Sequence, residues 1–219
     1  MFITFIKINI IMTLSIYTIN HPLVQHWSSY ILNVSNAKNE QKNIISQIFL
    51  ILLYESTRKS TELINLYLNK LEYITEINLI DRKKTNLIFS EIYLTEILGK
   101  NIYQFFPEAQ ILSFQIINLN KNKHYIKFDD LSSFFQLNTH VIIIEQYLDL
   151  NSVSRIINLI DCTQYVIKKI QIICLMCSNE ILQIINKKYN NINITIYTIT
   201  IIENNNNTEI QYLLNKIFG

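Results

Sequence analysis

The stretch Val141-Ile-Ile-Ile-Glu-Gln-Tyr-Leu-Asp-Leu-Asn-Ser-Val-Ser154 carries the clearest indication of the fold. Its first four residues are β-branched and apolar, so they predict a strand buried on both faces. A polar loop follows them, and residues 152–159 predict a helix. A buried strand that leads through a short loop into a helix is the first half of a βαβ unit.

The residues on both sides of this stretch continue the same pattern. Further β-branched runs lie at residues 111–117, 170–177 and 192–202, and a second helical stretch covers residues 180–188. Strands that alternate with helices of this length form parallel sheets. The sequence therefore predicts an α/β fold, with a mostly parallel sheet that helices cover on both faces.

The N-terminal part adds a strand and helices to this core. Residues 13–20 alternate polar and apolar side chains, as a strand does, whereas residues 23–33 and 44–58 carry apolar side chains at helical spacing. We interpret residues 36–43 as a polar break between those two helices and residues 60–71 as one more helix.

The pattern predicts a single domain over residues 1–219. Residues 13–59 form its N-terminal strand and helices, and residues 86–219 form its α/β core. Alternating polar residues at 118–130 predict a projecting hairpin.

The composition is dominated by three residue types. Ile, Asn and Lys together make up 88 of the 219 residues, against 2 Gly, 2 Pro, 2 Ala and 3 Arg. The first three are encoded by A/T-only codons and the last four need G or C, so we interpret the bias as that of an A/T-rich organelle genome. This interpretation predicts a location in the plastid stroma, with the cytoplasm as the alternative.

Charge, glycine content and cysteine content exclude several classes. A net charge of +2 gives no basic field for nucleic acid. Two glycines cannot build a Walker loop, a Rossmann fingerprint or a nucleophile elbow. The uncharged stretch at residues 8–20 is too short to span a bilayer, so no membrane contact is expected. Cys174 and Cys177 lie three apart in a predicted strand and should point to opposite faces, so no metal site is expected.

Four motifs occur in an order that resembles uracil phosphoribosyltransferase, a type I phosphoribosyltransferase. They are His21-Pro-Leu-Val-Gln-His-Trp27, Leu52-Leu-Tyr-Glu-Ser-Thr-Arg58, Phe106-Pro-Glu-Ala109 and Asn215-Lys-Ile-Phe-Gly219. The resemblance spans residues 13–219 and implies the type I phosphoribosyltransferase fold. It also implies the family reaction of pyrimidine salvage, in which uracil and phosphoribosyl pyrophosphate give UMP and pyrophosphate. In an active member, Mg²⁺ accompanies the pyrophosphate.

The resemblance assigns roles to eight residues. Glu145 takes the place of the acidic residue that binds the ribose hydroxyls, and the phosphate loop that follows it contains Asn151, Ser152 and Ser154. Tyr93 stands where the family has an arginine facing pyrophosphate. The uracil-binding tail ends with Ile217, Phe218 and Gly219.

All three substrate contacts depart from the family pattern. The phosphate loop has lost both glycines, which such a loop needs for backbone approach to an anion. A phenol with Glu91 and Glu96 nearby replaces the arginine fork. The tail is shortened and has no glycine at residues 207–215. We therefore expect the fold to survive with vestigial sites and weak or lost catalysis. The alternative is a non-catalytic member that serves as a binding or dimerisation module, with a homodimer as one form.

Overall fold

The computed structural model of the protein describes most of the chain. The described residues are 4–10, 14–33, 38–58, 63–70, 73–80, 86–106, 109–114, 117–118, 124–125, 140–161 and 169–203. Among them, no helix combines the length and the apolar character that crossing a bilayer requires.

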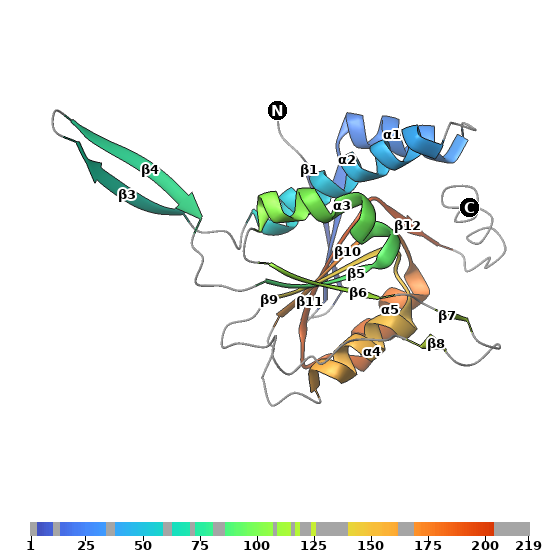
Figure 1. The fold of residues 1–219 in the computed structure, drawn as a ribbon. Coiled ribbons are helices and arrows are strands. Elements are labelled where there is room, and N and C mark those ends of the chain that lie inside the picture. The colour runs from blue at the N-terminus through green and yellow to red at the C-terminus, as the bar shows by residue number, and fades with distance from the viewer. Residues whose placement is uncertain are drawn as a thin grey trace.

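The centre of the molecule is one large sheet (Figure 1). Its strands stand in the order β1-β2-β11-β10-β9-β5-β6, and β12 also pairs with β10. All pairs are parallel except β1 with β2. The strand bounds are β1 Thr4–Ile10, β2 Leu14–Asn20, β5 Asn86–Glu91, β6 Gln110–Phe114, β9 His140–Tyr147, β10 Lys169–Ser178, β11 Asn193–Thr198 and β12 Thr200–Ile202. The predicted mostly parallel α/β sheet is therefore confirmed.

Strand β9 lies between β5 and β10, as its apolar run predicts. Val141, Ile142, Ile143 and Ile144 are all fully buried. Val141 and Ile143 belong to one core cluster, and Ile142 and Ile144 belong to the other. A strand that is apolar on both sides can lie only inside a sheet with two covered faces, so this run fixes the layered architecture.

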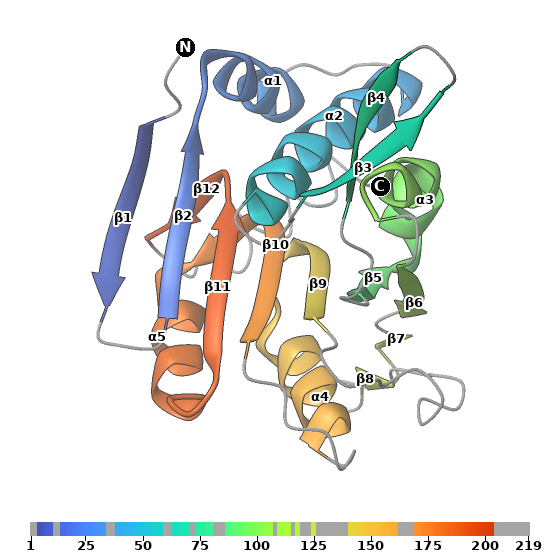
Figure 2. The same ribbon diagram turned by 90° about the vertical axis from the view of Figure 1, so that its left-hand side faces the viewer.

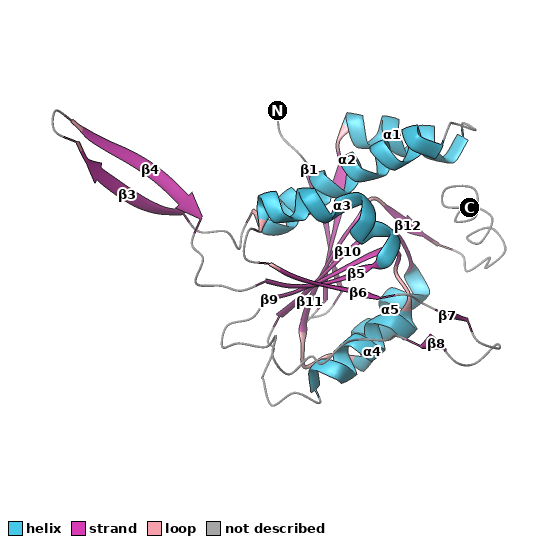
Figure 3. Ribbon diagram, viewed as in Figure 1, coloured by secondary structure: helices cyan, strands magenta, loops and turns pink. Residues whose placement is uncertain are grey.

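Five helices among the described residues cover the two faces of the sheet (Figures 1 and 3). One face carries α1 (Pro22–Asn33), α2 (Lys38–Thr57) and α3 (Ile92–Phe105), whereas the other carries α4 (Leu150–Asp161) and α5 (Asn179–Lys188). Helix α2 runs obliquely across the strands (Figure 2). Its end is tied to β10 because the Gln171 amide donates a hydrogen bond to the Ser56 carbonyl at 3.0 Å.

Two of the predicted element assignments are wrong. Residues 60–71 contain no described helix, because β3 (Leu63–Asn69) pairs with β4 (Ile74–Ile80) in a separate antiparallel hairpin. The polar break predicted at residues 36–43 is also wrong, since α2 already begins at Lys38. In the polar start of this helix, Glu40 is exposed, whereas Gln41 is buried.

The hairpin predicted at residues 118–130 is present in a short form. Strands β7 (Ile117–Asn118) and β8 (His124–Tyr125) pair antiparallel. Residues 126–130 lie outside the described part of the chain. The β3–β4 hairpin, which was not predicted, extends much farther from the sheet (Figure 1).

Helix α2 offers a matched test of this packing. Phe49 is fully buried between the helix and the sheet, whereas Tyr54 on the same helix is 54% exposed. We expect Phe49→Ala to lower the free energy of unfolding by about 3–5 kcal/mol, because it leaves a cavity in the core. Tyr54→Ala should change it by no more than about 0.5 kcal/mol. Chemical denaturation measures both values, and equal effects would contradict the packing described.

Candidate functional site

Three carboxylates meet at the carboxyl edge of the sheet. Glu91 is the last residue of β5, Glu145 lies near the end of the neighbouring strand β9, and Asp149 directly precedes α4. In open parallel sheets, substrates bind outside this edge. The described residues at this edge therefore form the candidate site.

Glu145 is fully buried, and its own loop satisfies its carboxylate. One oxygen accepts a hydrogen bond from the backbone N–H of Asp149 at 3.0 Å. The other accepts a hydrogen bond from the Ser152 hydroxyl. A buried carboxylate needs such donors, so the loop folds back over β9.

Asp149 occupies the N-cap position of α4. Its carboxylate accepts a hydrogen bond from the backbone N–H of Ser152 at 3.2 Å. N-terminal amides of a helix are natural donors to an anion. At the start of α4, the Ser152 amide already donates to the Asp149 side chain and not to a bound anion.

The buried location changes the acidity of both glutamates. Burial raises the pKa of Glu145 well above its ordinary value, and the neighbouring Glu91 raises it further. Burial also raises the pKa of Glu91 from 4.5 to about 7. A hydrogen bond from the Gln146 amide, at 3.5 Å, partly opposes that rise, and the charge of Asp149 adds to it.

The other predicted phosphate-loop residues are separated from Glu145. Asn151 is exposed in the first turn of α4. Ser154 accepts a hydrogen bond from Lys188 of α5 at 3.2 Å. Of the predicted phosphate-loop residues, the structure therefore shows Ser152 bonded to Glu145, whereas the side chain of Ser154 is bonded to α5.

Tyr93 lies in the first turn of α3 and not in a loop, because β5 ends at Glu91 and the helix begins at Ile92. Its ring packs against the core cluster of α1, α2 and α3, on the face of the sheet opposite α4. Lys42 lies 5.7 Å from the ring centroid. Burial and then the charge of Glu96 raise the pKa of the phenol. The predicted uracil-binding residues Ile217, Phe218 and Gly219 lie outside the described residues.

The sequence analysis did not assign Asp149 to the site and mentioned Glu91 only as a neighbour of Tyr93. A local signal existed for Asp149, since an aspartate directly before a helical stretch is a typical N-cap. The signal for Glu91 was an acidic residue at the end of an apolar strand. Its neighbour in space, Gln146, is 55 residues away in sequence.

The expectation for the two cysteines is wrong in one respect. Cys174 and Cys177 belong to the same core cluster, and their side chains are hydrogen-bonded to each other. Strict alternation breaks at Leu175 and Met176, which both belong to the opposite cluster. Burial raises the pKa of the Cys174 thiol. In the part of the chain that is described, no group of three or more His, Cys, Asp or Glu side chains is placed to hold a metal ion.

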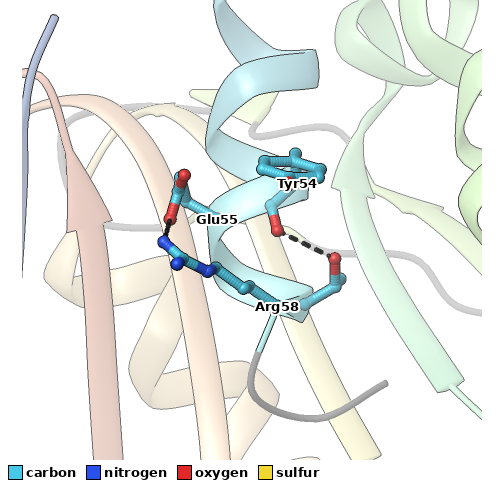
Figure 4. A network of polar contacts seen from close by, with 4 residues as sticks. Tyr54, Glu55 and Arg58 are labelled. Carbon is cyan, nitrogen blue, oxygen red and sulfur yellow. Dashed lines mark hydrogen bonds and ion pairs between the residues drawn. The ribbon is translucent and has the colours of Figure 1, made fainter. Parts of the chain in front are cut away.

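The motif at residues 52–58, at the end of α2, has a structural role in this molecule. Glu55 is buried and forms an ion pair with Arg58, with 3.7 Å between their side-chain atoms (Figure 4). The Arg58 N–H also donates to the Tyr54 carbonyl at 3.1 Å. This arrangement closes the C-terminal turn of α2 above β10.

Comparison with known proteins finds similar proteins over most of the chain. No family model matches the chain. It is 26% identical over 211 residues to a uracil phosphoribosyltransferase homolog of Porphyra purpurea, covering 95% of this chain and 100% of that protein. It is 28% identical over 171 residues to a protein of the same name from Pyropia yezoensis, covering 77% of this chain and 80% of that protein.

Over most of its length, the chain is similar to these uracil phosphoribosyltransferase homologs. The predicted resemblance is thereby confirmed. Among solved structures, the AQ2163 protein of Aquifex aeolicus matches with a TM-score of 0.66 at 14% identity, covering 87% of this chain and 89% of that one. That similarity supports the same α/β fold.

The raised pKa of Glu91 gives the protein a testable pH dependence. The folded state binds this proton more tightly than the unfolded state does, so stability should fall as the pH rises from 4.5 through about 7. Between about pH 5 and about pH 8, the free energy of unfolding of the wild type should decrease. We expect this decrease to be smaller by on the order of 1 kcal/mol in Glu91→Gln, because the variant has no group to ionise at this position. Denaturation at several pH values measures this effect. Glu96→Gln, an exposed neighbour, should leave the profile unchanged.

Proposed function

We propose that the chain is a uracil phosphoribosyltransferase homologue in which turnover is weak or lost. One observation carries the proposal: the Asp149 and Ser152 amides at the start of α4 already donate to carboxylates of the chain itself. A phosphate loop works through free amides of this kind. Here the donors are taken by the carboxyl groups of Glu145 and Asp149.

The electrostatics of this edge support the same conclusion. Phosphoribosyl pyrophosphate is strongly negative, and it would meet Glu91, Glu145 and Asp149 at the carboxyl edge. Those of the three that are ionised would repel it, and binding it would also raise the pKa of the others further, which is costly in a partly buried site. The arginine that would offset them is Tyr93 in this chain, and a phenol provides neither a positive charge nor a fork of donors.

The residues of this site do not suit a resident Mg²⁺. One oxygen of Asp149 and both oxygens of Glu145 accept hydrogen bonds from the loop, so they are not available as an open set of ligands. Mg²⁺ therefore enters the proposal only as the counter-ion of bound phosphoribosyl pyrophosphate, and only if the chain proves active.

Activity is tested directly. We expect the purified chain, incubated with uracil, phosphoribosyl pyrophosphate and Mg²⁺, to form little or no UMP above the uncatalysed background. We also expect no thermal shift with either substrate, because neither gains donors on binding. Chromatography of the nucleotides and a thermal melt provide the two readouts.

A matched pair of variants tests whether any UMP formation that is observed comes from the candidate site. Rapid UMP formation that is abolished by Glu145→Ala, and unchanged by Glu180→Ala at the exposed start of α5, would refute the proposal. The second candidate function is a non-catalytic binding or dimerisation module. It is favoured by the same closed loop, since α4 is stabilised without any ligand.

We further propose that the protein acts in the plastid stroma, with the cytoplasm as the alternative. The A/T-codon bias of the chain supports this proposal, and so do relatives from Porphyra and Pyropia, which are red algae. We expect an antibody against the protein to detect it in the soluble fraction of isolated plastids. Detection in the cytosolic fraction alone would contradict this location.

A further inference from the structure

Cys174 and Cys177, near the end of β10, are a pair of thiols that the proposed function does not use. Both are free cysteines with fully buried side chains. Their side chains are hydrogen-bonded to each other within the core cluster that packs against α4 and α5. A disulfide needs two sulfur atoms that can approach each other without backbone movement. Two hydrogen-bonded thiols on one face of a strand meet that requirement.

The backbone between the two cysteines is held on both sides. The Met176 carbonyl accepts a hydrogen bond from the Leu148 N–H at 3.0 Å, just beyond β9, and the Leu175 carbonyl accepts one from the Ile199 N–H at 3.1 Å, between β11 and β12. The side chains of Leu175 and Met176 both belong to the opposite core cluster, so the two cysteines share the other face. The sheet therefore holds the two thiols together in their reduced form.

The two thiols differ in acidity. Burial raises the pKa of Cys174 well above its ordinary value. The hydrogen bond from Cys174 lowers the pKa of Cys177; burial opposes this effect, and the Thr198 hydroxyl adds to it. The thiolate is the reactive form of cysteine. Cys177 is therefore the nucleophile of the pair, whereas Cys174 keeps its proton.

Access to Cys177 depends on the short strand β12. Cys177 pairs with Ile201 of this strand, and the Ile201 side chain packs on the same core cluster while it stays partly exposed. Strand β12 has three residues, and among the described residues it pairs only with β10. Short edge segments with part-exposed side chains open locally at a low free-energy cost. Local opening of β12 therefore uncovers Cys177.

The surroundings of the pair favour a small uncharged reactant. Cys174 pairs with Glu145 of β9, and that carboxyl group lies close enough to add to the rise in the pKa of Cys174. An anionic reactant would meet this acidic group in a buried position, which is costly. Hydrogen peroxide has no charge and is nearly as small as water, so it suits a site that opens only briefly.

We propose that Cys174 and Cys177 form a redox-active dithiol, which hydrogen peroxide converts to an intramolecular disulfide. The Cys177 thiolate attacks one peroxide oxygen, the O–O bond breaks, and the leaving hydroxide takes up the proton that Cys177 lost on ionising. The Cys174 sulfur then attacks the sulfenic acid at Cys177, so that the S–S bond forms and the S–O bond breaks. A second water leaves with the Cys174 proton.

The balance of this reaction is two thiols oxidised by two electrons and one peroxide reduced to two molecules of water. The inference goes beyond the proposed function, because it concerns thiol chemistry and holds whether or not the chain turns over substrate. A chain that forms no UMP can still form the disulfide, and an active chain can fail to form it.

Mass spectrometry of the folded, full-length chain after treatment with hydrogen peroxide tests the proposal. We expect the peptide that contains both cysteines to lose about 2 Da, which is two hydrogen atoms, and dithiothreitol to reverse the loss. Cys162, the third cysteine, lies outside the described residues. Cys162→Ser should therefore form the same disulfide as the wild type.

Two single variants separate the roles of the pair. In Cys174→Ser the sulfenic acid has no second thiol to react with, so dimedone, a reagent for sulfenic acids, should label Cys177. In Cys177→Ser the same treatment should label Cys174 at least about tenfold less, because that thiol keeps its proton. Labelling of Cys174 that equals or exceeds that of Cys177 would contradict the assigned order of attack.

Two neighbouring residues of β12 give a matched test of access. Ile201 packs on the cluster that contains both cysteines, whereas Ile202 packs on the opposite cluster. We expect Ile201→Ala to speed disulfide formation at least about threefold relative to Ile202→Ala, which carries the same truncation in the same strand. Equal rates in the two variants would contradict access through β12.

Three results would overturn the proposal as a whole. One is a folded wild type whose two thiols stay reduced in peroxide and react only after denaturation in guanidinium. Another is a disulfide from either cysteine to Cys162 in place of the bond between Cys174 and Cys177. The third is oxidation to sulfinic or sulfonic acid without any disulfide, which would show that the second thiol does not reach the first. Circular dichroism of each variant confirms that the folded chain is compared.

Discussion

The carboxyl edge of the sheet is organised by one fully buried carboxyl group, that of Glu145. A carboxyl group in this position must be hydrogen-bonded, because leaving it without donors costs several kcal/mol. The donors within reach are the Asp149 amide and the Ser152 hydroxyl. Their use forces the loop after β9 back over the strand and fixes where α4 begins. The closed loop is therefore a direct consequence of burying Glu145.

Most of the sheet could be predicted because its signals are local. The run Val141–Ile144 is apolar on both sides, and α5 has a serine N-cap, an acidic first turn and a basic last turn. The assignment at residues 60–71 failed because the apolar spacing of Leu63, Ile64, Leu66 and Leu68 fits a helix as well as a strand. The pairing with β4, beyond a turn, decides between them, and pairing is not a local property. For Cys174 and Cys177, a break in alternation at Leu175 and Met176 could not be read from the residues themselves.

The sequence predicted which family residues are missing from the candidate site. It did not predict which side chains accept the hydrogen bonds of the loop amides. The absence of glycine from the phosphate loop and of the arginine at position 93 can be read from the sequence. Which side chains accept hydrogen bonds from the loop amides depends on how deeply Glu145 is buried. It also depends on the pairing of β5 with β9. Gln146 meets Glu91 only because these two strands are neighbours, although 55 residues separate them in sequence.

The residues that close the loop also stabilise the fold, and they do so without a bound ligand. A glycine-rich loop has high conformational entropy in the unfolded chain, so Asn151 and Ser152 at those positions reduce the entropy lost on folding. Asp149 adds an N-cap to α4, an interaction typically worth about 1 kcal/mol. The strongest demand for the parallel sheet comes from β9, whose apolar run needs neighbours on both sides whatever the loop binds. The loop before α4 is closed by hydrogen bonds of its own side chains, so its stability does not depend on a bound anion.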